Sequence, residues 1–139
     1  MALLIHLLGI CVLISLNCLA KQNCTVNHEW KKAREECEKE MDKTDDCFWN
    51  CVQGELGGLD DSGRPSLEKL SEAVAKVIKE PDVVEALRKS HEECISQFND
   101  TMTPCEESKL LNVCSWGDAE LQQALQGANY CVYNPANPS

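Results

Sequence analysis

Cysteine is the residue type whose spacing in this chain most clearly points to chemistry. The chain has 139 residues and 10 cysteines. Cys47 and Cys51 are separated by three residues, and Cys105 and Cys114 by eight. Residues four positions apart lie on one face of a helix. Cys47 and Cys51 can therefore form disulfide bonds from one helix to two different partners, and such bonds connect three or more helices.

The amino-terminal segment is typical of a secretory signal. Its apolar run from Leu7 to Leu16 is too short to span a bilayer, and small residues precede position 21. We predict a signal peptide at residues 1–20 and a single helical domain at residues 21–139. An uncleaved membrane anchor is the alternative, because no Lys or Arg precedes the apolar run. The prediction places the mature protein outside the cell.

Two of the ten cysteines, Cys11 and Cys18, leave with this signal, so eight remain. An even number of cysteines in a small secreted domain predicts four disulfide bonds. The net charge of -10 disfavours nucleic acid and anionic membranes as partners. The same charge keeps a secreted protein soluble, and it also favours cationic ligands such as amines.

Catalytic patterns are missing from the sequence. Beyond residue 20 only His28 and His91 are histidines, and no G-x-S-x-G, H-E-x-x-H or glycine-rich phosphate loop occurs. The acidic run at 60–62 resembles the start of a calcium loop, but Pro65 and Ser71 stand where such a loop needs Gly and Glu. We therefore predict no enzyme activity, no metal and no cofactor. Two N-x-T sequons make Asn23 and Asn99 candidate glycosylation sites.

Helical periodicity and capping residues predict a helix in nearly every segment. No strand or domain linker is indicated. The expected helices run from Asn27 to about Met41, from a cap at Thr44 to Leu56, from a cap at Ser66 to Ile78, from Pro81 to about Phe98, from a capping box at Thr103 to between Cys114 and Trp116, and from Asp118 to Gly127.

The segment DCFWNCVQGELGGLDDSGRPSLEKL combines a C-x-x-x-C helix, an apolar step, an acidic glycine turn and a new helix. Together with the cysteine spacings of three and eight, this pattern resembles the insect odorant-binding protein family of the pheromone and general odorant-binding type. The resemblance covers most of the chain after the signal. It implies an all-α fold, a compact disulfide-stapled bundle of about six helices around an internal apolar cavity.

The resemblance also implies the disulfide bonds Cys47–Cys105 and Cys94–Cys114. It leaves the partner of Cys51 open, because both Cys24 and Cys37 precede Cys47.

Helix geometry favours one of these two cysteines. In an antiparallel hairpin that turns near residue 42, Cys37 is about 4.5 Å out of step with Cys51, whereas Cys24 is about 15 Å out of step. We therefore favour Cys37–Cys51, which leaves Cys24 to pair with Cys131 and tie the two ends together. Pairing of Cys24 with Cys51 stays open as the alternative.

The resemblance implies that aliphatic helix faces line a pocket for a small hydrophobic ligand. The same residues at helical spacing also fit a filled core, so they define faces rather than contacts. His91 is either a pH-sensitive group in the pocket or an ordinary half-buried histidine. Tyr130 and Tyr133 either close over the ligand or lie on the surface. The candidate pocket residues are Phe48, Val52, Leu56, Leu70, Val74, Val77, Ile78, Val84, Leu87, His91, Leu110, Val113, Trp116, Tyr130 and Tyr133.

The leading hypothesis is a secreted carrier of odorants, pheromones or similar molecules through aqueous sensory fluid. A non-olfactory scavenger in saliva, venom or reproductive fluid shares this fold. A disulfide-stapled bundle with a filled core, acting through its surface on a receptor, is the alternative from another class. The expected partners are a small hydrophobic ligand and a membrane chemoreceptor, and the expected state is a monomer or a weak homodimer.

Overall fold

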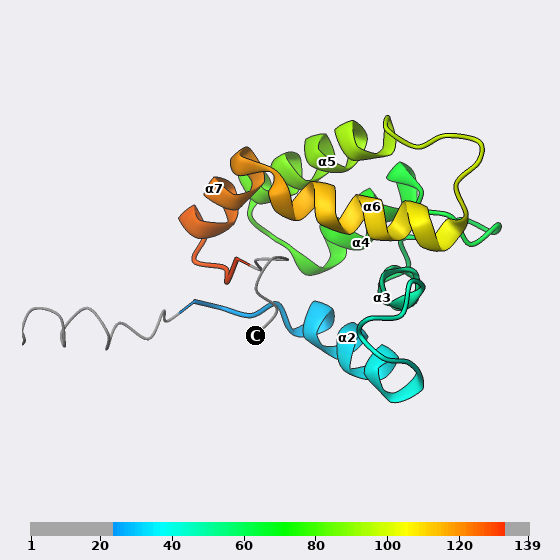
Figure 1. Cartoon of the computed structure of the whole chain (residues 1–139). Coiled ribbons are helices and arrows are strands. Elements are labelled where there is room, and N and C mark those ends of the chain that lie inside the picture. The colour runs from blue at the N-terminus through cyan, green and yellow to red at the C-terminus, as the bar shows by residue number, and fades with distance from the viewer. Residues whose placement is uncertain (1–23, 133–139) are drawn as a thin grey trace, which may run out of the picture.

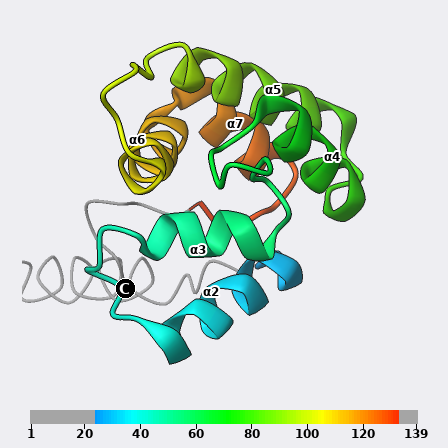
Figure 2. The same ribbon diagram turned by 90° about the vertical axis from the view of Figure 1, so that its right-hand side faces the viewer.

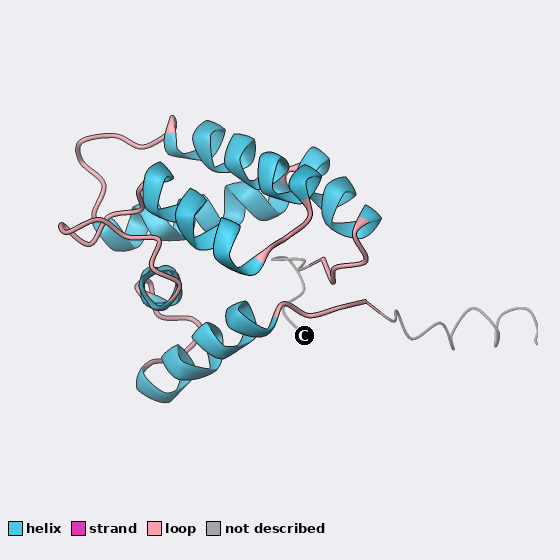
Figure 3. Ribbon diagram, turned by 180° about the vertical axis from the view of Figure 1, so that it is seen from behind, coloured by secondary structure: helices cyan, strands magenta, loops and turns pink. Residues whose placement is uncertain are grey.

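The computed structural model describes residues 24–132, and within this range the regular structure is entirely helical (Figure 1, Figure 3). The predicted all-α fold is therefore confirmed, whereas the predicted signal peptide lies outside the described residues. The helices are α2 (His28–Glu40), α3 (Phe48–Glu55), α4 (Leu67–Val77), α5 (Pro81–Ile95), α6 (Pro104–Gly117) and α7 (Ala119–Gly127).

Side-chain caps fix the starts of four helices as expected from the sequence. Asn27, Ser66 and Asp118 each accept a hydrogen bond from a backbone N–H in the first turn that follows. Thr103 and Glu106 form a reciprocal capping box at the start of α6. Each cap satisfies an N–H group that has no partner within its helix.

The expected cap at Thr44 was wrong. The carboxylate of Asp42 accepts hydrogen bonds from the backbone N–H of Thr44 at 2.8 Å and from its hydroxyl at 2.7 Å. The Asp45 carboxylate accepts the N–H of Cys47 at 2.8 Å, so this N–H is not capped by Thr44. Helix α3 begins at Phe48, with Cys47 at the N-cap position.

The helices form two groups (Figure 2). Helices α2 and α3 pack against each other in antiparallel fashion on one side, and α4, α5, α6 and α7 lie on the other. Helix α5 contacts α4, α6 and α7, and α6 also packs on α3. The cavity described below lies where the two groups face each other.

Four disulfide bonds join these elements. They pair Cys37 with Cys51, Cys47 with Cys105, Cys94 with Cys114, and Cys24 with Cys131. These are the pairs that the sequence analysis favours. The bonds link α2 to α3, α3 to α6, α5 to α6, and the two ends of the described chain to each other.

The loop between α3 and α4 is attached to α6. Asp60 organises the loop by accepting hydrogen bonds from Ser62 and Arg64, and these bonds lower the pKa of its carboxyl group. The Asn50 side chain donates to the carbonyl of Gly63 and to the Ser108 hydroxyl, both at 3.0 Å. The acidic run at 60–62 therefore forms a turn, which Asp60 stabilises through its side chain and which Gly63, with its positive φ, completes.

Candidate functional site

An apolar cavity of about 560 Å³ lies between the two groups of helices. This volume is within the range that accommodates a small organic ligand. Every described helix contributes to its wall. The aliphatic lining consists of Val52 of α3, Leu56 at the C-cap of α3, Leu70, Ala73, Val74 and Val77 of α4, Ile78 at the C-cap of α4, Leu87 of α5, Leu111 of α6, Leu121 and Leu125 of α7, and Val26 and Val132 near the two ends of the described chain.

All three tryptophans of the chain line this cavity. The ring centroids of Trp30 and Trp116 are 5.4 Å apart in an edge-to-face arrangement, and those of Trp30 and Trp49 are 5.9 Å apart. The guanidinium of Arg34 lies 5.6 Å from the Trp30 centroid and 5.9 Å from that of Trp49. The α2 side of the cavity is therefore an aromatic surface with one cation packed against it.

Charged residues of α2 line the cavity in pairs of opposite sign. Lys31 and Glu35 are 3.6 Å apart, and Arg34 and Glu38 are 3.7 Å apart. Because each cation has an anion one turn away, these four residues add no net charge to the cavity.

The two ends of the described chain form one edge of the cavity. Val26, Asn27 and the segment 130–132 are among its lining residues. The disulfide Cys24–Cys131 joins the two ends. Backbone hydrogen bonds from the Cys131 N–H to the Thr25 carbonyl (2.9 Å) and from the Thr25 N–H to the Asn129 carbonyl (2.8 Å) flank this bond.

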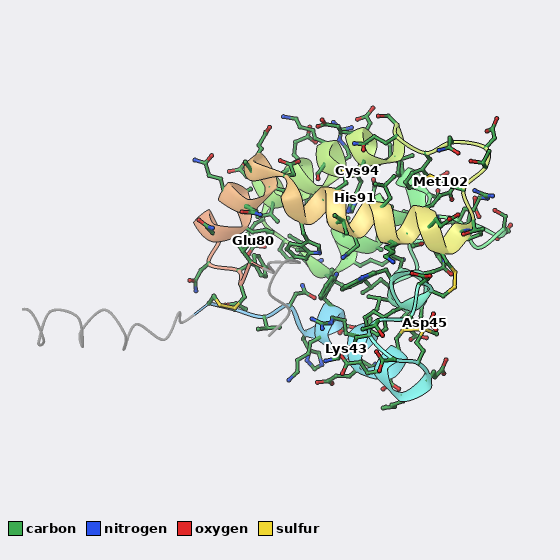
Figure 4. The ribbon with its side chains drawn as sticks, in the orientation of Figure 1. Lys43, Asp45, Glu80, His91, Cys94 and Met102 are labelled. Carbon is green, nitrogen blue, oxygen red and sulfur yellow. A yellow bond between two sulfur atoms is a disulfide. The ribbon has the colours of Figure 1, made fainter. Side chains whose placement is uncertain are left out.

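Tyr130 adds a further attachment to this edge. Its hydroxyl donates to a carboxylate oxygen of Glu80 at 3.0 Å (Figure 4 labels Glu80). Burial and this bond raise the pKa of Tyr130. The edge is therefore held by one covalent bond and by hydrogen bonds to two different segments.

Polar side chains lie in the inner wall. Gln53 of α3, His91 of α5 and Asn112 of α6 line the cavity and are 8%, 9% and 6% exposed. Burial lowers the pKa of His91 to about 4, because the charged imidazolium loses its hydration there. His91, labelled in Figure 4, is therefore neutral at pH 7 and at pH 5. This weakens the idea that its protonation at mildly acidic pH controls the pocket.

Most of the residues that the sequence nominated for the pocket do line the cavity. Ten of them are lining residues, namely Val52, Leu56, Leu70, Val74, Val77, Ile78, Leu87, His91, Trp116 and Tyr130. The structure therefore brings the nominated faces of α3, α4 and α5 together. Tyr133 lies outside the described residues.

Four nominated residues are placed elsewhere. Phe48 is 1% exposed and packs with Ala33, Cys37 and Val52 between α2 and α3. Val84 packs against the outside of the α5–α7 core, and Leu110 is half-buried away from the lining.

Val113 is 51% exposed. Its nomination assumed that the aliphatic residues of α6 face inward. The structure instead turns Leu111, Asn112 and Ser115 toward the cavity.

The sequence reasoning missed Trp30, Trp49, Leu121 and Leu125 as lining residues. The spacing of Leu121 and Leu125 could have identified these two residues as inward-facing, because they form the apolar stripe of α7. Nothing in the spacing of Trp30 and Trp49 distinguished a ligand wall from an ordinary core.

Metal and membrane sites are not found in the described part of the chain. Within residues 24–132, no three His, Cys, Asp or Glu side chains are grouped as a metal site would require. None of the helices in this range has the length and apolar character needed to cross a bilayer. Asn99 is exposed in the loop between α5 and α6, and Asn23 lies outside the described residues.

Comparison with known proteins identifies the family. The family model described as PBP/GOBP family matches residues 13–117, which is more than half of the chain. No curated protein and no solved structure matched in the corresponding searches. The matched range includes every cysteine of the disulfide framework except Cys131. Members of this family are carriers that bind small odorants and pheromones. The chain therefore belongs to the PBP/GOBP family of insect odorant-binding proteins.

Proposed function

We propose that the mature protein, residues 21–139 after removal of the signal at 1–20, is secreted and carries small hydrophobic odorants, pheromones or similar molecules through aqueous sensory fluid. The observation that supports this most strongly is the cavity of about 560 Å³, with its aliphatic and tryptophan walls, in a chain of this family. A carrier needs an interior that shields an apolar ligand from water, and such a cavity supplies it.

The energetics suit reversible binding. A ligand that buries about ten methylenes gains roughly 8 kcal/mol from removal of apolar surface from water. Association costs at least about 4 kcal/mol in lost motion, and ordering of side chains costs more. The difference of about 4 kcal/mol corresponds to a Kd of about 1 mM. A ligand that buries about fifteen methylenes gains roughly 12 kcal/mol and reaches micromolar affinity, which still allows the ligand to be released.

The cavity disfavours the alternative in which a filled bundle acts only through its surface. It does not separate an olfactory carrier from a scavenger in saliva, venom or reproductive fluid, because both need the same interior. We favour the olfactory role because the matched family is defined by pheromone and odorant binding. The tissue in which the transcript is found distinguishes the two.

The partners follow from the same proposal. The ligand is a small hydrophobic molecule, a membrane chemoreceptor receives it, and the protein works as a monomer or a weak homodimer. Nucleic acid is not a partner, because the net charge of -10 repels a polyanion.

The test is ligand titration of the oxidised protein without residues 1–20. Because all three tryptophans line the cavity, a bound ligand changes their environment and hence the intrinsic fluorescence. Displacement of an apolar fluorescent probe by volatile alcohols, esters and fatty acids is measured in parallel. Saturable, reversible micromolar binding in both assays supports the carrier, whereas no saturable binding by correctly oxidised protein contradicts it.

A further inference from the structure

The polar wall of the cavity, which we define as Gln53, His91 and Asn112, has hydrogen-bonding groups that have no partner among residues 24–132. All three side chains are more than nine-tenths buried and come from different helices. Buried polar groups in folded proteins almost always have a partner. A group of buried polar side chains without partners, placed in a ligand cavity, therefore indicates where a polar part of the ligand binds.

Gln53 contributes an acceptor. Its Nε2 donates to the backbone carbonyl of Ser108 at 3.2 Å, and this bond determines which end of the amide is nitrogen. Its Oε1 has no hydrogen-bond partner within residues 24–132 and almost no accessible surface, so a ligand reaches it only after a small shift of a neighbouring side chain. An amide oxygen can only accept, so a ligand group that reaches it must donate.

His91 and Asn112 each contribute a donor and an acceptor. The Nδ1 of His91 is buried without a partner, and within residues 24–132 neither the imidazole nor the Asn112 carboxamide forms a hydrogen bond. A neutral imidazole carries one N–H and one bare nitrogen in either tautomer, and a carboxamide carries both an oxygen and an NH₂ group. The wall therefore offers donors as well as acceptors.

The charged residues that line the cavity in the described part of the chain occur in pairs of opposite sign, so none is left to compensate a charged ligand. Lys31 and Arg34 are already paired with Glu35 and Glu38 on α2, and the polar wall itself is uncharged. An ammonium or carboxylate placed at this wall would lose its hydration without gaining an ion pair. A neutral head group avoids this cost.

We propose that the preferred ligand class is a neutral amphiphile with a hydroxyl group, an inference that rests on the proposed carrier function. Gln53, His91 and Asn112 form hydrogen bonds with the hydroxyl group of the ligand, and its hydrocarbon chain lies among the aliphatic residues. A hydroxyl both donates and accepts, so it satisfies this wall better than an aldehyde or ester, which only accepts. The net value of one such bond corresponds to about a twofold to tenfold difference in affinity.

The test compares four ten-carbon ligands that differ only in head group: 1-decanol, decanal, decanoate and decylamine. Affinities are measured at pH 7 by intrinsic fluorescence and by probe displacement. We expect 1-decanol to bind about twofold to tenfold more tightly than decanal. The two ions are expected to bind more weakly than both. A decanoate or decylamine affinity equal to that of 1-decanol overturns the assignment.

Two variants locate the effect. Asn112→Leu keeps the side-chain volume and removes the amide, so the preference for 1-decanol over decanal should fall while decanal binding persists. Gln53→Met keeps the side-chain length, removes the Gln53 amide and should likewise reduce the preference for 1-decanol. It provides a second test if Asn112→Leu does not fold. Val113→Leu, on the exposed face of α6, is the matched control and should keep the preference. Retention of the preference in both Asn112→Leu and Gln53→Met overturns the proposal.

The same experiment separates this inference from the carrier function. Equal binding of 1-decanol and decanal by the unmodified protein overturns the hydroxyl preference and leaves the carrier in place. Failure of all four ligands to bind overturns both.

Discussion

Arg64 and Glu107 form an ion pair that fastens the loop between α3 and α4 to the first turn of α6. The two partners differ in burial, since the Arg64 side chain is 39% exposed and that of Glu107 is 6% exposed. Arg64 also donates to the backbone carbonyl of Met102 at 3.2 Å, so it links the α5–α6 loop to the same point. Replacement of Arg64 and replacement of Glu107 should therefore lower the free energy of unfolding by different amounts.

The first prediction follows from this asymmetry. Arg64→Met leaves a buried carboxylate without its cation and should lower the free energy of unfolding by about 3 to 5 kcal/mol. Glu107→Gln leaves a neutral amide in the buried position and an arginine that reaches water, so the loss should be only about 1 to 2 kcal/mol. Urea unfolding measures both. Equal losses of unfolding free energy in the two variants would show that the difference in burial does not determine the contribution of each partner. The control is Glu85→Gln, which removes an exposed ion pair with Arg88 and should change the free energy of unfolding little.

The second prediction concerns stability as a function of pH. Burial holds the pKa of His91 at about 4, below its ordinary value of 6.5. Between pH 6.5 and 4 the unfolded chain therefore binds a proton that the folded chain does not, and stability falls as the pH is lowered through this window. The total loss is about 3 kcal/mol, from 1.36 kcal/mol per pKa unit.

Urea unfolding at pH 7, 6, 5 and 4 checks this, with His91→Gln as the variant that lacks the titrating group. The variant should lose the slope between pH 6.5 and about 5. From about pH 5 downward, both proteins should still respond to protonation of carboxylates whose pKa is lowered in the folded state, such as Glu106, which accepts hydrogen bonds from Thr103, and Asp60, which accepts from Ser62 and Arg64. Parallel curves for both proteins above pH 4 would exclude His91 as the source.

The third prediction concerns the disulfide between the chain ends. Replacing both Cys24 and Cys131 by Ser should lower the free energy of unfolding by roughly 2 to 5 kcal/mol, because a long loop is no longer closed. Ligand dissociation should also become faster, since the joined segments line the cavity. Stopped-flow displacement of the probe measures this rate. Tyr130→Phe, which removes only the bond to Glu80, should have a smaller effect, and an unchanged rate in the double variant would show that this edge does not retain the ligand.

The fourth prediction uses the cavity volume. Val74→Phe adds bulk to a half-buried lining residue of α4 and should weaken ligand binding about tenfold or more, with stability retained because the ring fills open space. Val113→Phe on the exposed face of α6 is the matched control and should leave binding unchanged. Equal affinities for Val74→Phe and the unmodified protein would place the ligand outside this cavity.

The fifth prediction concerns Asn99. Its side-chain oxygen accepts hydrogen bonds from the Thr101 N–H at 3.0 Å and from the Thr101 hydroxyl at 2.6 Å, in an exposed loop. Expression through a eukaryotic secretory pathway should add a glycan here. Glycosidase treatment should increase the electrophoretic mobility, and Asn99→Gln should remove the part of this change that does not come from Asn23. Identical glycosidase shifts for Asn99→Gln and the unmodified protein would contradict this site.

Capping chemistry made the helix boundaries predictable, because the residues that satisfy the first N–H groups are adjacent to them in sequence. The capping box of Thr103 and Glu106 and the cap at Asp118 illustrate this. Thr44 failed as a cap because a competing acceptor, the Asp45 carboxylate, takes the N–H of Cys47 that the Thr44 hydroxyl oxygen would have accepted. Local alternatives of similar energy cannot be ranked from the pattern alone.

The inward face of α6 was not predictable from hydrophobicity. Glu107, Ser108, Asn112 and Ser115 are all buried, although a helix is expected to expose such residues. Three of them have partners from distant segments, since Arg64 pairs with Glu107, Asn50 donates to the Ser108 hydroxyl, and the Ser115 hydroxyl donates to the Cys94 sulfur. These partners come from other parts of the fold and cannot be recognised in the sequence of α6. The polar stripe of α6 therefore suggested a solvent-exposed face, whereas this face is buried.

The disulfide bonds divide the helices into two kinds. Helices α2, α3, α5 and α6 each carry at least one bridged cysteine, whereas α4 and α7 contain no cysteine and are held by noncovalent contacts. Both of these helices line the cavity, through residues such as Val74 and Leu125. Small displacements of α4 and α7 can thus change the cavity volume without straining a covalent bond. We expect backbone amide exchange in these two helices to slow most when a ligand binds, and ligands of unequal length to be accommodated on this side of the molecule.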